Sequence, residues 1–308
     1  MTHHARLVLA VSSVALAALS GCGGSHATRR AAPRSVFTYD AKRPLRFQDR
    51  GRVNKNYPIA VRDVSFSTPS GTVPAFLVEP PRRGRLPAVI YLHGSGGDRS
   101  ELLVPATWIA ARGAVALVLT APSAAAQATG GSALRELRRQ RDLAVDDVVA
   151  VRRAVDLLRS RPNVDPNRIG FVGWSAGART GAVVTGVEPR IRAFVLMSAG
   201  ASPVAAYVAR APAQLRAAVG RLLRQVDPLR YVAKADADRL LLEDGRRDEI
   251  VPRAALMAVI RAAPRGTAVR WYAAGHALDA RAYRDQLAWL ARKLGIRGRP
   301  VAGAASGP

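Results

Sequence analysis

The pentapeptide GWSAG at residues 173–177 decides which fold the sequence predicts. It has the form GxSxG, it follows the apolar run RIGFV at residues 168–172, and it leads into a small-residue stretch that begins AGAR. In a strand–turn–helix context the serine stands on a sharply bent backbone, and the flanking glycines keep side chains away from neighbouring strands. The hydroxyl of Ser175 is therefore expected above the edge of a sheet, as a nucleophile. A tight turn with an idle serine is the simpler alternative.

A serine hydroxyl needs a base to take its proton, and few histidines are available for that role. His3, His4 and His26 belong to the N-terminal leader and tether described below. His93 opens HGSGG after a predicted strand, and such a turn supplies backbone donors in hydrolases. His276 follows the last predicted strand in AGHAL and is the expected base. A structural histidine that caps the final helix is the alternative.

The carboxylate that orients this histidine is expected between residues 176 and 275, because the chain order is serine, acid, histidine. Asp248 is the best choice, since it lies in DGRRDEIVP a few residues beyond an apolar strand. Asp244 at the end of that strand and Glu249 in the same loop remain alternatives.

Two backbone N–H groups are expected to hold the negative oxygen of a tetrahedral intermediate. One belongs to Ala176, directly after the serine, and the other to Ser95 in the loop that begins at residue 93. Gly94, Gly96 and Gly97 would let that loop approach a substrate closely. A glycine-rich turn can also cradle phosphate, but no GxxxxGK(S/T) pattern follows, which argues against nucleotide binding.

Apolar runs of strand length alternate with helical patterns along the chain, which predicts a mostly parallel sheet covered by helices. Residues 61–67 and 72–79 flank the turn signal TPSG and predict an antiparallel hairpin. Six continuous apolar runs follow, as expected of buried parallel strands: residues 87–92, 114–120, 168–173, 191–198, 239–243 and 268–273.

Apolar side chains at helical spacing predict helices over residues 144–158 and 283–294, the second ending at Gly295. A longer excursion runs from 201 to 231, in which Leu215, Val219, Leu222 and Val226 share one face. This pattern fits a small lid over a pocket and an ordinary helix covering the sheet equally well.

Composition excludes several classes of protein. With 308 residues, 49% of them hydrophobic, the chain can bury the core of one folded domain. A single cysteine and five histidines exclude a disulfide framework and a Cys/His zinc site. The net charge is +25, yet the arginines are scattered and only four basic residues are lysines, which argues against nucleic acid. A generic basic surface is expected, with weak association to acidic lipid or cell-wall polymer as the alternative.

The N-terminus has the pattern of an export signal. The apolar stretch LVLAVSSVALAAL at residues 7–19 follows Arg6 and is too short to span a bilayer comfortably. It closes with LSGC, which resembles the lipobox of bacterial lipoproteins and would make Cys22 the lipidated residue. A cleaved secretory signal is the alternative. We therefore expect four segments: a signal peptide (1–21), a flexible tether (22–36), one catalytic domain (37–296) and a disordered tail (297–308).

Together, HGSGG, GWSAG, DGRRDEIVP and the GH of AGHAL resemble the α/β-hydrolase superfamily, within it the dienelactone hydrolase-like and prolyl-oligopeptidase-like serine hydrolases. The stretch NVDPNRIGFVGWSAG is particularly similar to that group. The resemblance implies an eight-stranded, mostly parallel sheet with helices on both faces and the triad at its carboxyl edge. Dienelactone hydrolases themselves use a cysteine nucleophile, whereas this position is Ser175, so dienelactone is not the expected substrate.

The sequence thus predicts an exported, lipid-anchored serine hydrolase on the extracytoplasmic side of the cell membrane. It would cleave a small-molecule carboxylic ester through an acyl-enzyme intermediate, without metal or cofactor. Two alternatives stay open. The same triad could act on an amide or a thioester, or transfer the acyl group, and a non-catalytic lipoprotein could use the scaffold to bind cell-envelope ligands.

Overall fold

The computed structural model describes residues 35–54, 58–126 and 131–298. The predicted signal peptide, Cys22 and nearly all of the predicted tether and tail lie outside these residues. Phe37, the first residue of the predicted domain, has no exposed surface and belongs to the hydrophobic core. Within the described ranges, no helix is both long enough and apolar enough to cross a membrane.

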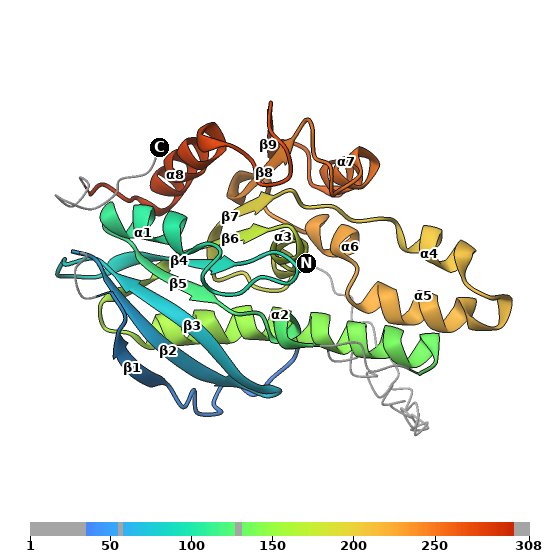
Figure 1. Cartoon of the computed structure of the whole chain (residues 1–308), viewed down its shortest axis with the longest axis horizontal. Helices are drawn as coiled ribbons and strands as arrows, with labels where there is room; N and C mark the ends of the chain where they lie inside the picture. Colours follow the sequence, from blue (N-terminus) through green and yellow to red (C-terminus); the bar gives the residue numbers. More distant parts are fainter. Residues whose placement is uncertain (1–34, 55–57, 127–130, 299–308) are drawn as a thin grey trace, which may run out of the picture. The chain divides into compact units, whose positions relative to one another are not determined.

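The described residues form one nine-stranded sheet with the strand order β1-β2-β3-β5-β4-β6-β7-β8-β9 (Figure 1). Strands β2 (Ala60–Thr68) and β3 (Gly71–Glu79) form the predicted antiparallel hairpin. The six strands after it are parallel to their neighbours within the group, as predicted. They are β4 (Leu86–Leu92), β5 (Val115–Leu119), β6 (Val164–Trp174), β7 (Ile191–Met197), β8 (Leu240–Gly245) and β9 (Ala268–Tyr272).

The prediction of eight strands is one short, because the sheet has an additional edge strand, β1 (Gln48–Arg52). Its sequence QDRGR contains no apolar residue, and most of the strand is exposed. It pairs antiparallel with β2, the next strand along the chain. An edge strand without apolar alternation gives no periodic signal, so sequence patterning could not detect it.

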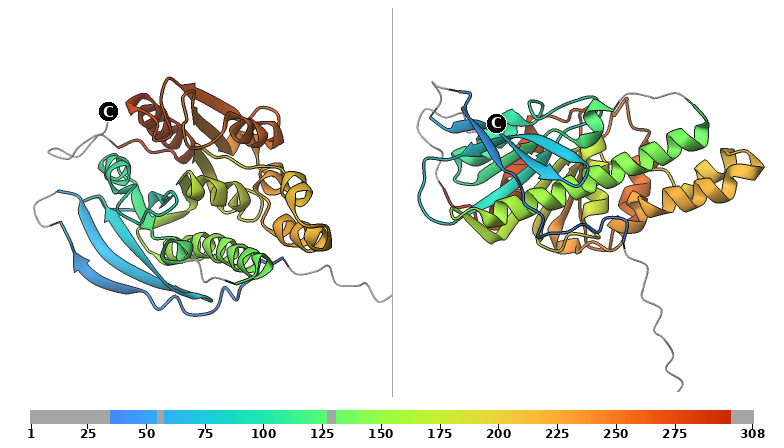
Figure 2. Two further views of the ribbon diagram at one scale, coloured as in Figure 1. Left: turned by 45° about the vertical axis from the view of Figure 1, so that its right-hand side comes forward. Right: turned by 90° about the horizontal axis from the view of Figure 1, so that it is seen from below.

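The central strands are buried because helices cover both faces of the sheet (Figure 2). In β4, Ile90 and Leu92 join the core under α2 (Ala133–Ser160) and α3 (Ala176–Val184). Val89 and Tyr91 point to the opposite core, under α1 (Leu103–Ala111) and α8 (Ala280–Leu294). Both predicted helical stripes are confirmed, and α8 ends at Gly295, which adopts the left-handed conformation with φ 63°.

The excursion between β7 and β8 contains three helices: α4 (Val204–Arg210), α5 (Arg216–Gln225) and α6 (Pro228–Val232). The last packs against α3 and against α7 (Arg253–Ala262), whereas α5 packs against α4 and α2. Figures 1 and 2 show α4, α5 and the first half of α2 extending side by side beyond the sheet. Short 3₁₀ turns complete the described chain at Pro122–Ala125, Ala213–Leu215 and Ala237–Arg239.

Candidate active site

Ser175 occupies the turn between β6 and α3 in a conformation that L-residues rarely adopt. Its φ of 54° and ψ of −112° place it in a strained region, which persists only where the surroundings enforce it. Its N–H donates to the carbonyl oxygen of Met197 at 2.9 Å, and its own carbonyl oxygen accepts from the N–H of Arg179 at 2.9 Å. These bonds hold the hydroxyl at the carboxyl end of the parallel strands.

The glycine after this turn is required by a close approach of two backbones. A Cβ atom at Gly177 would lie 2.2 Å from the carbonyl oxygen of Leu92, so no other residue fits. The N–H of Gly177 donates to the carbonyl oxygen of His93 at 3.0 Å. A Cβ atom at Gly94 would in turn lie 3.4 Å from the Cβ of Ser175. The HGSGG loop therefore runs directly beside the serine.

His276 and Asp248 meet in the loops that follow β9 and β8. The Nδ1 atom of His276 lies 2.9 Å from Oδ2 and 3.0 Å from Oδ1 of Asp248. Glu249 contacts the same residue only through its backbone, accepting the N–H of His276 at 3.2 Å. Among the carboxyl groups that the sequence left open, only Asp248 forms a hydrogen bond with the imidazole in the described residues, and Asp244 does not.

The carboxyl group of Asp248 is held in its charged form. Burial alone would raise its pKa, but hydrogen bonds from the N–H groups of Val251 and Ile250 and from His276 outweigh burial. The net result is a pKa below the ordinary value, so Asp248 carries a negative charge beside the imidazole at neutral pH.

The backbone of His276 is fixed next to the serine turn by two side chains that sequence reasoning missed. The indole Nε1 of Trp174 donates to the carbonyl oxygen of His276 at 3.0 Å, and the hydroxyl of Ser198 donates to the same oxygen at 2.9 Å. The rings of Trp174 and His276 lie 5.3 Å apart between centroids. Because these contacts join residues far apart in sequence, no local pattern could have indicated them.

The structure thus brings Ser175, Asp248 and His276 to one edge of the sheet, at the ends of β6, β8 and β9. Among the described residues, no hydrogen bond joins the Ser175 hydroxyl to the His276 ring. In enzymes without substrate this bond is often longer than in the substrate complex.

Both ring nitrogens of His93 form hydrogen bonds with backbone groups, one in its own loop and one after β5. Its Nε2 accepts the N–H of Ala121 at 2.9 Å, so its Nδ1 carries the proton and donates to the carbonyl oxygen of Gly94 at 2.7 Å. The N–H of Gly94 is bound by Glu101 at 2.7 Å. In the described part of the chain, the N–H groups of Ser95 and Ala176 have no such partner, which leaves both available to a ligand.

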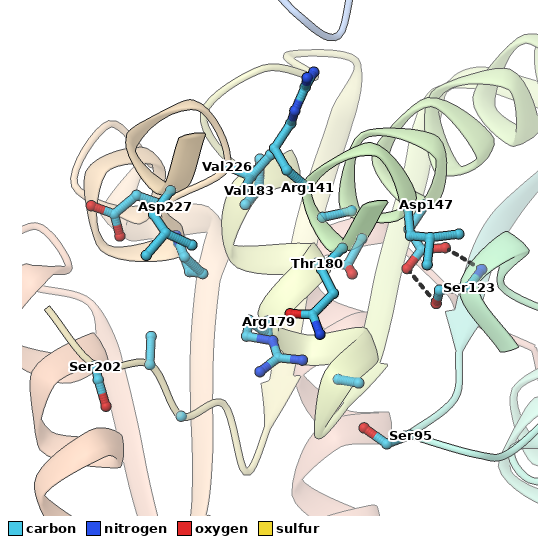
Figure 3. A pocket seen from close by; sticks show the side chains of 18 of the residues that line it. Ser95, Ser123, Arg141, Asp147, Arg179, Thr180, Val183, Ser202, Val226 and Asp227 are labelled. Carbon is cyan, nitrogen blue, oxygen red and sulfur yellow. Dashed lines mark hydrogen bonds between the residues drawn. The ribbon is translucent and has the colours of Figure 1, made fainter. Parts of the chain in front are cut away.

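A cavity of about 990 Å³ opens beside the start of α3. In Figure 3, Arg179 and Thr180 extend into it from α3, and Ser95 marks the HGSGG loop. On another wall, Asp147 accepts hydrogen bonds from the N–H and the hydroxyl of Ser123 at 3.0 and 2.7 Å. Burial raises the pKa of the Asp147 carboxyl. No group of three or more potential metal ligands was found among the residues that the structure describes.

The carboxyl group of Asp244, at the end of β8, is a titrating group beneath the site. Burial, together with the charge of Asp248, raises its pKa from 3.8 to about 7, although Arg253 opposes the shift. Between these two pH values the folded protein binds more protons at this position than the unfolded chain. Stability therefore falls as the pH rises through this window.

We predict that Asp244→Asn stabilises the protein at high pH, because the asparagine has no proton to lose. The gain in the free energy of unfolding should grow from about pH 5 to about pH 9 and reach the order of 2–4 kcal/mol. Chemical denaturation at both pH values measures it, with the exposed Asp238→Asn as control. A gain that shrinks toward high pH would contradict the assignment.

Comparison with known proteins finds a match to the model of the dienelactone hydrolase family over residues 73–291. No curated protein matches the sequence. The similar solved structures include acetyl xylan esterase from Paenibacillus sp. R4, with TM-score 0.66, 19% identity and coverage of 82% of this chain and 90% of that one. Acetyl xylan esterase 1 from Thermoanaerobacterium sp. JW/SL YS485 has TM-score 0.63, 19% identity and coverage of 80% and 87%.

The protein TT1662 from Thermus thermophilus is also similar, with TM-score 0.56, 22% identity and coverage of 78% of this chain and 99% of that one. At these identities the structures show a common fold, which is the predicted α/β-hydrolase fold. The substrate in the names of the two acetyl xylan esterases describes those proteins alone.

Proposed function

Because the chain belongs to the dienelactone hydrolase family, we propose that it is a serine hydrolase that cleaves carboxylic esters through an acyl-enzyme intermediate. The observation that carries the proposal is the His276–Asp248 hydrogen bond, formed beside a strained serine turn. Acetyl xylan esterases among the structural neighbours also favour ester substrates. The residue at the nucleophile position is Ser175, whereas dienelactone hydrolases use a cysteine at this position.

In the proposed mechanism the negative charge of Asp248 keeps the proton of His276 on Nδ1, which leaves Nε2 free to act as the base. Nε2 takes the proton of the Ser175 hydroxyl as its oxygen attacks the ester carbonyl carbon. The N–H groups of Ala176 and Ser95 donate to the resulting oxyanion. The intermediate then collapses, the bond to the alcohol oxygen breaks, and His276 returns the proton to that oxygen.

The acyl group is now bound to Ser175, and a second cycle releases it. Water loses a proton to His276 and attacks the acyl carbon, and the same two N–H groups hold the second oxyanion. The Ser175 oxygen leaves, takes the proton back from His276, and the carboxylic acid departs.

The purified protein is expected to hydrolyse p-nitrophenyl acetate, and one equivalent of a fluorophosphonate should abolish the activity. Turnover of a matched thioester and a matched anilide under the same conditions distinguishes ester from other acyl chemistry. Failure to hydrolyse any ester, combined with no uptake of the fluorophosphonate, would contradict the proposal and favour a non-catalytic binding protein.

We also propose that the protein is exported and anchored through a lipid on Cys22, on the basis of the LSGC sequence alone. Cys22→Ala is expected to move the protein from the membrane fraction to the soluble fraction, because the lipid provides the membrane affinity. Immunoblotting of fractionated cells measures the distribution. An unchanged distribution would show that Cys22 is not the anchor.

A further inference from the structure

We propose that the substrate ester carries a long apolar chain, and that this chain lies in a groove between the first half of α2 and α5. This proposal rests on the proposed function and specifies its substrate class. The α2–α5 groove is the part of the cavity lined by Leu134, Leu137 and Ala144 of α2 and by Val219 and Leu223 of α5.

The α2 wall of the groove carries an apolar stripe, interrupted where Gln140 and Arg141 also line the cavity. Leu134, Leu137, Ala144 and Val148 lie at helical spacing on one face, and all of them line the cavity. Val148 at the inner end is buried under the sheet, whereas the other three are not fully buried. The outer part of this apolar stripe is therefore only partly covered by protein.

The α5 wall also carries an apolar stripe, and no side chain of this stripe is fully buried. Leu215, just before the helix, and Val219, Leu223 and Val226 recur at helical spacing and line the cavity. Gly220 is the only buried residue of α5, and Leu215 and Val226 at its two ends are also partly exposed, so none of these apolar side chains is fully covered. Two facing apolar stripes that the protein leaves partly bare are typical of a ligand groove.

The cavity that contains the groove reaches the residues beside the proposed nucleophile. Ser95 and Ala176, whose N–H groups we assign to the oxyanion, line it, whereas Ser175 and His276 do not. Arg179 and Thr180 lie on α3 close to the serine turn and place polar groups at the ester end of the cavity. An ester bound at Ser175 can therefore extend an attached hydrocarbon chain between the two helices.

The size of the cavity favours a long chain over an acetyl group. Its volume of about 990 Å³ is at the upper end of the range for small-molecule sites. An acetyl group would leave the walls of the α2–α5 groove bare. Each methylene group buried there contributes favourable transfer free energy. Because this free energy also stabilises the transition state, it raises kcat/KM.

The test compares p-nitrophenyl esters of straight-chain acids from acetate to dodecanoate, and acetate esters of straight-chain alcohols from ethanol to dodecanol. The first series places the chain on the acyl side, and the second places it on the alcohol side. In one of the two series, kcat/KM should rise by about two- to fourfold for each added methylene group until the groove is filled.

The variant Val219→Trp fills the middle of the groove. It should lower kcat/KM for the long-chain ester by about tenfold or more and leave p-nitrophenyl acetate nearly unchanged, because only the long chain needs the groove. Ala217→Trp is the matched control, since Ala217 is exposed on α5 and does not line the cavity. It should preserve the dependence on chain length.

A flat or falling chain-length profile in both series would overturn the groove assignment, as would equal effects of Val219→Trp and Ala217→Trp. Hydrolysis of short esters that requires Ser175 would leave the proposed function intact in that case. If no ester of either series is hydrolysed and no fluorophosphonate is taken up, the proposed function itself fails.

Discussion

Replacing Ser175 with alanine is expected to lower kcat for a p-nitrophenyl ester by about 10⁶-fold, because the acyl-enzyme can no longer form. The cavity and the N–H groups of Ala176 and Ser95 would remain, so residual catalysis above the rate in water is expected from binding and oxyanion stabilisation. Steady-state kinetics with the acetate ester measures the effect, at protein concentrations high enough to detect the residual activity.

The matched control for this variant is Ser95→Ala. We assign only the backbone N–H of Ser95 to the oxyanion, and alanine retains that group, so kcat should stay within about tenfold of the wild-type value. Circular dichroism establishes that both variants are folded. Loss of activity in both variants to the same degree, or retention of activity in Ser175→Ala, would place the nucleophile elsewhere.

The variant Asp248→Asn is expected to lower kcat by about 10⁴-fold. An asparagine side chain can donate a hydrogen bond to Nδ1 and thereby favour the wrong tautomer of His276. It also removes the negative charge that stabilises the imidazolium in the transition state. The Asp248 side chain is buried, and its Oδ1 accepts the N–H groups of Ile250 and Val251. Because the amide oxygen of an asparagine can accept the same two bonds, the variant should keep the shape of the loop.

Glu249→Gln is the control that separates the role of the Asp248 carboxylate from a general effect of negative charge in the loop. Glu249 contacts only the backbone N–H of His276, and a glutamine can still accept that bond. We expect kcat to change by less than about tenfold, since the imidazole keeps its partner. If Glu249→Gln proves as damaging as Asp248→Asn, the orienting carboxylate is misassigned.

The parts of the fold that could be predicted are those with a strong local pattern. Continuous apolar runs indicated the six parallel strands, and the apolar stripe before Gly295 indicated α8. β1 escaped prediction because its sequence contains no apolar residue and therefore has no apolar alternation. For 201–231 the amphipathic pattern was ambiguous, and the packing of α5 against α2 became visible only in the structure.

In the candidate site, too, the residues that lie in a strong local pattern could be predicted, and the contacts between distant loops could not. The strand–GxSxG–helix pattern indicated the turn at Ser175, and chain order limited the acid to a few carboxyl groups. The sequence favoured Asp248 but left Asp244 and Glu249 open, because the final choice depends on how the loops after β8 and β9 meet. Trp174 and Ser198 carried no signal for their contacts with His276, which span 102 and 78 residues.

The central claim is that Ser175 is acylated during turnover. The most direct measurement mixes the wild-type protein with a p-nitrophenyl ester, stops the reaction in acid within milliseconds, and locates the added mass by peptide mapping. We predict a burst of about one equivalent of p-nitrophenol and an acyl group on the peptide that contains Ser175. Linear release without a burst and without an adduct, or an acyl group on any other residue, would contradict the account.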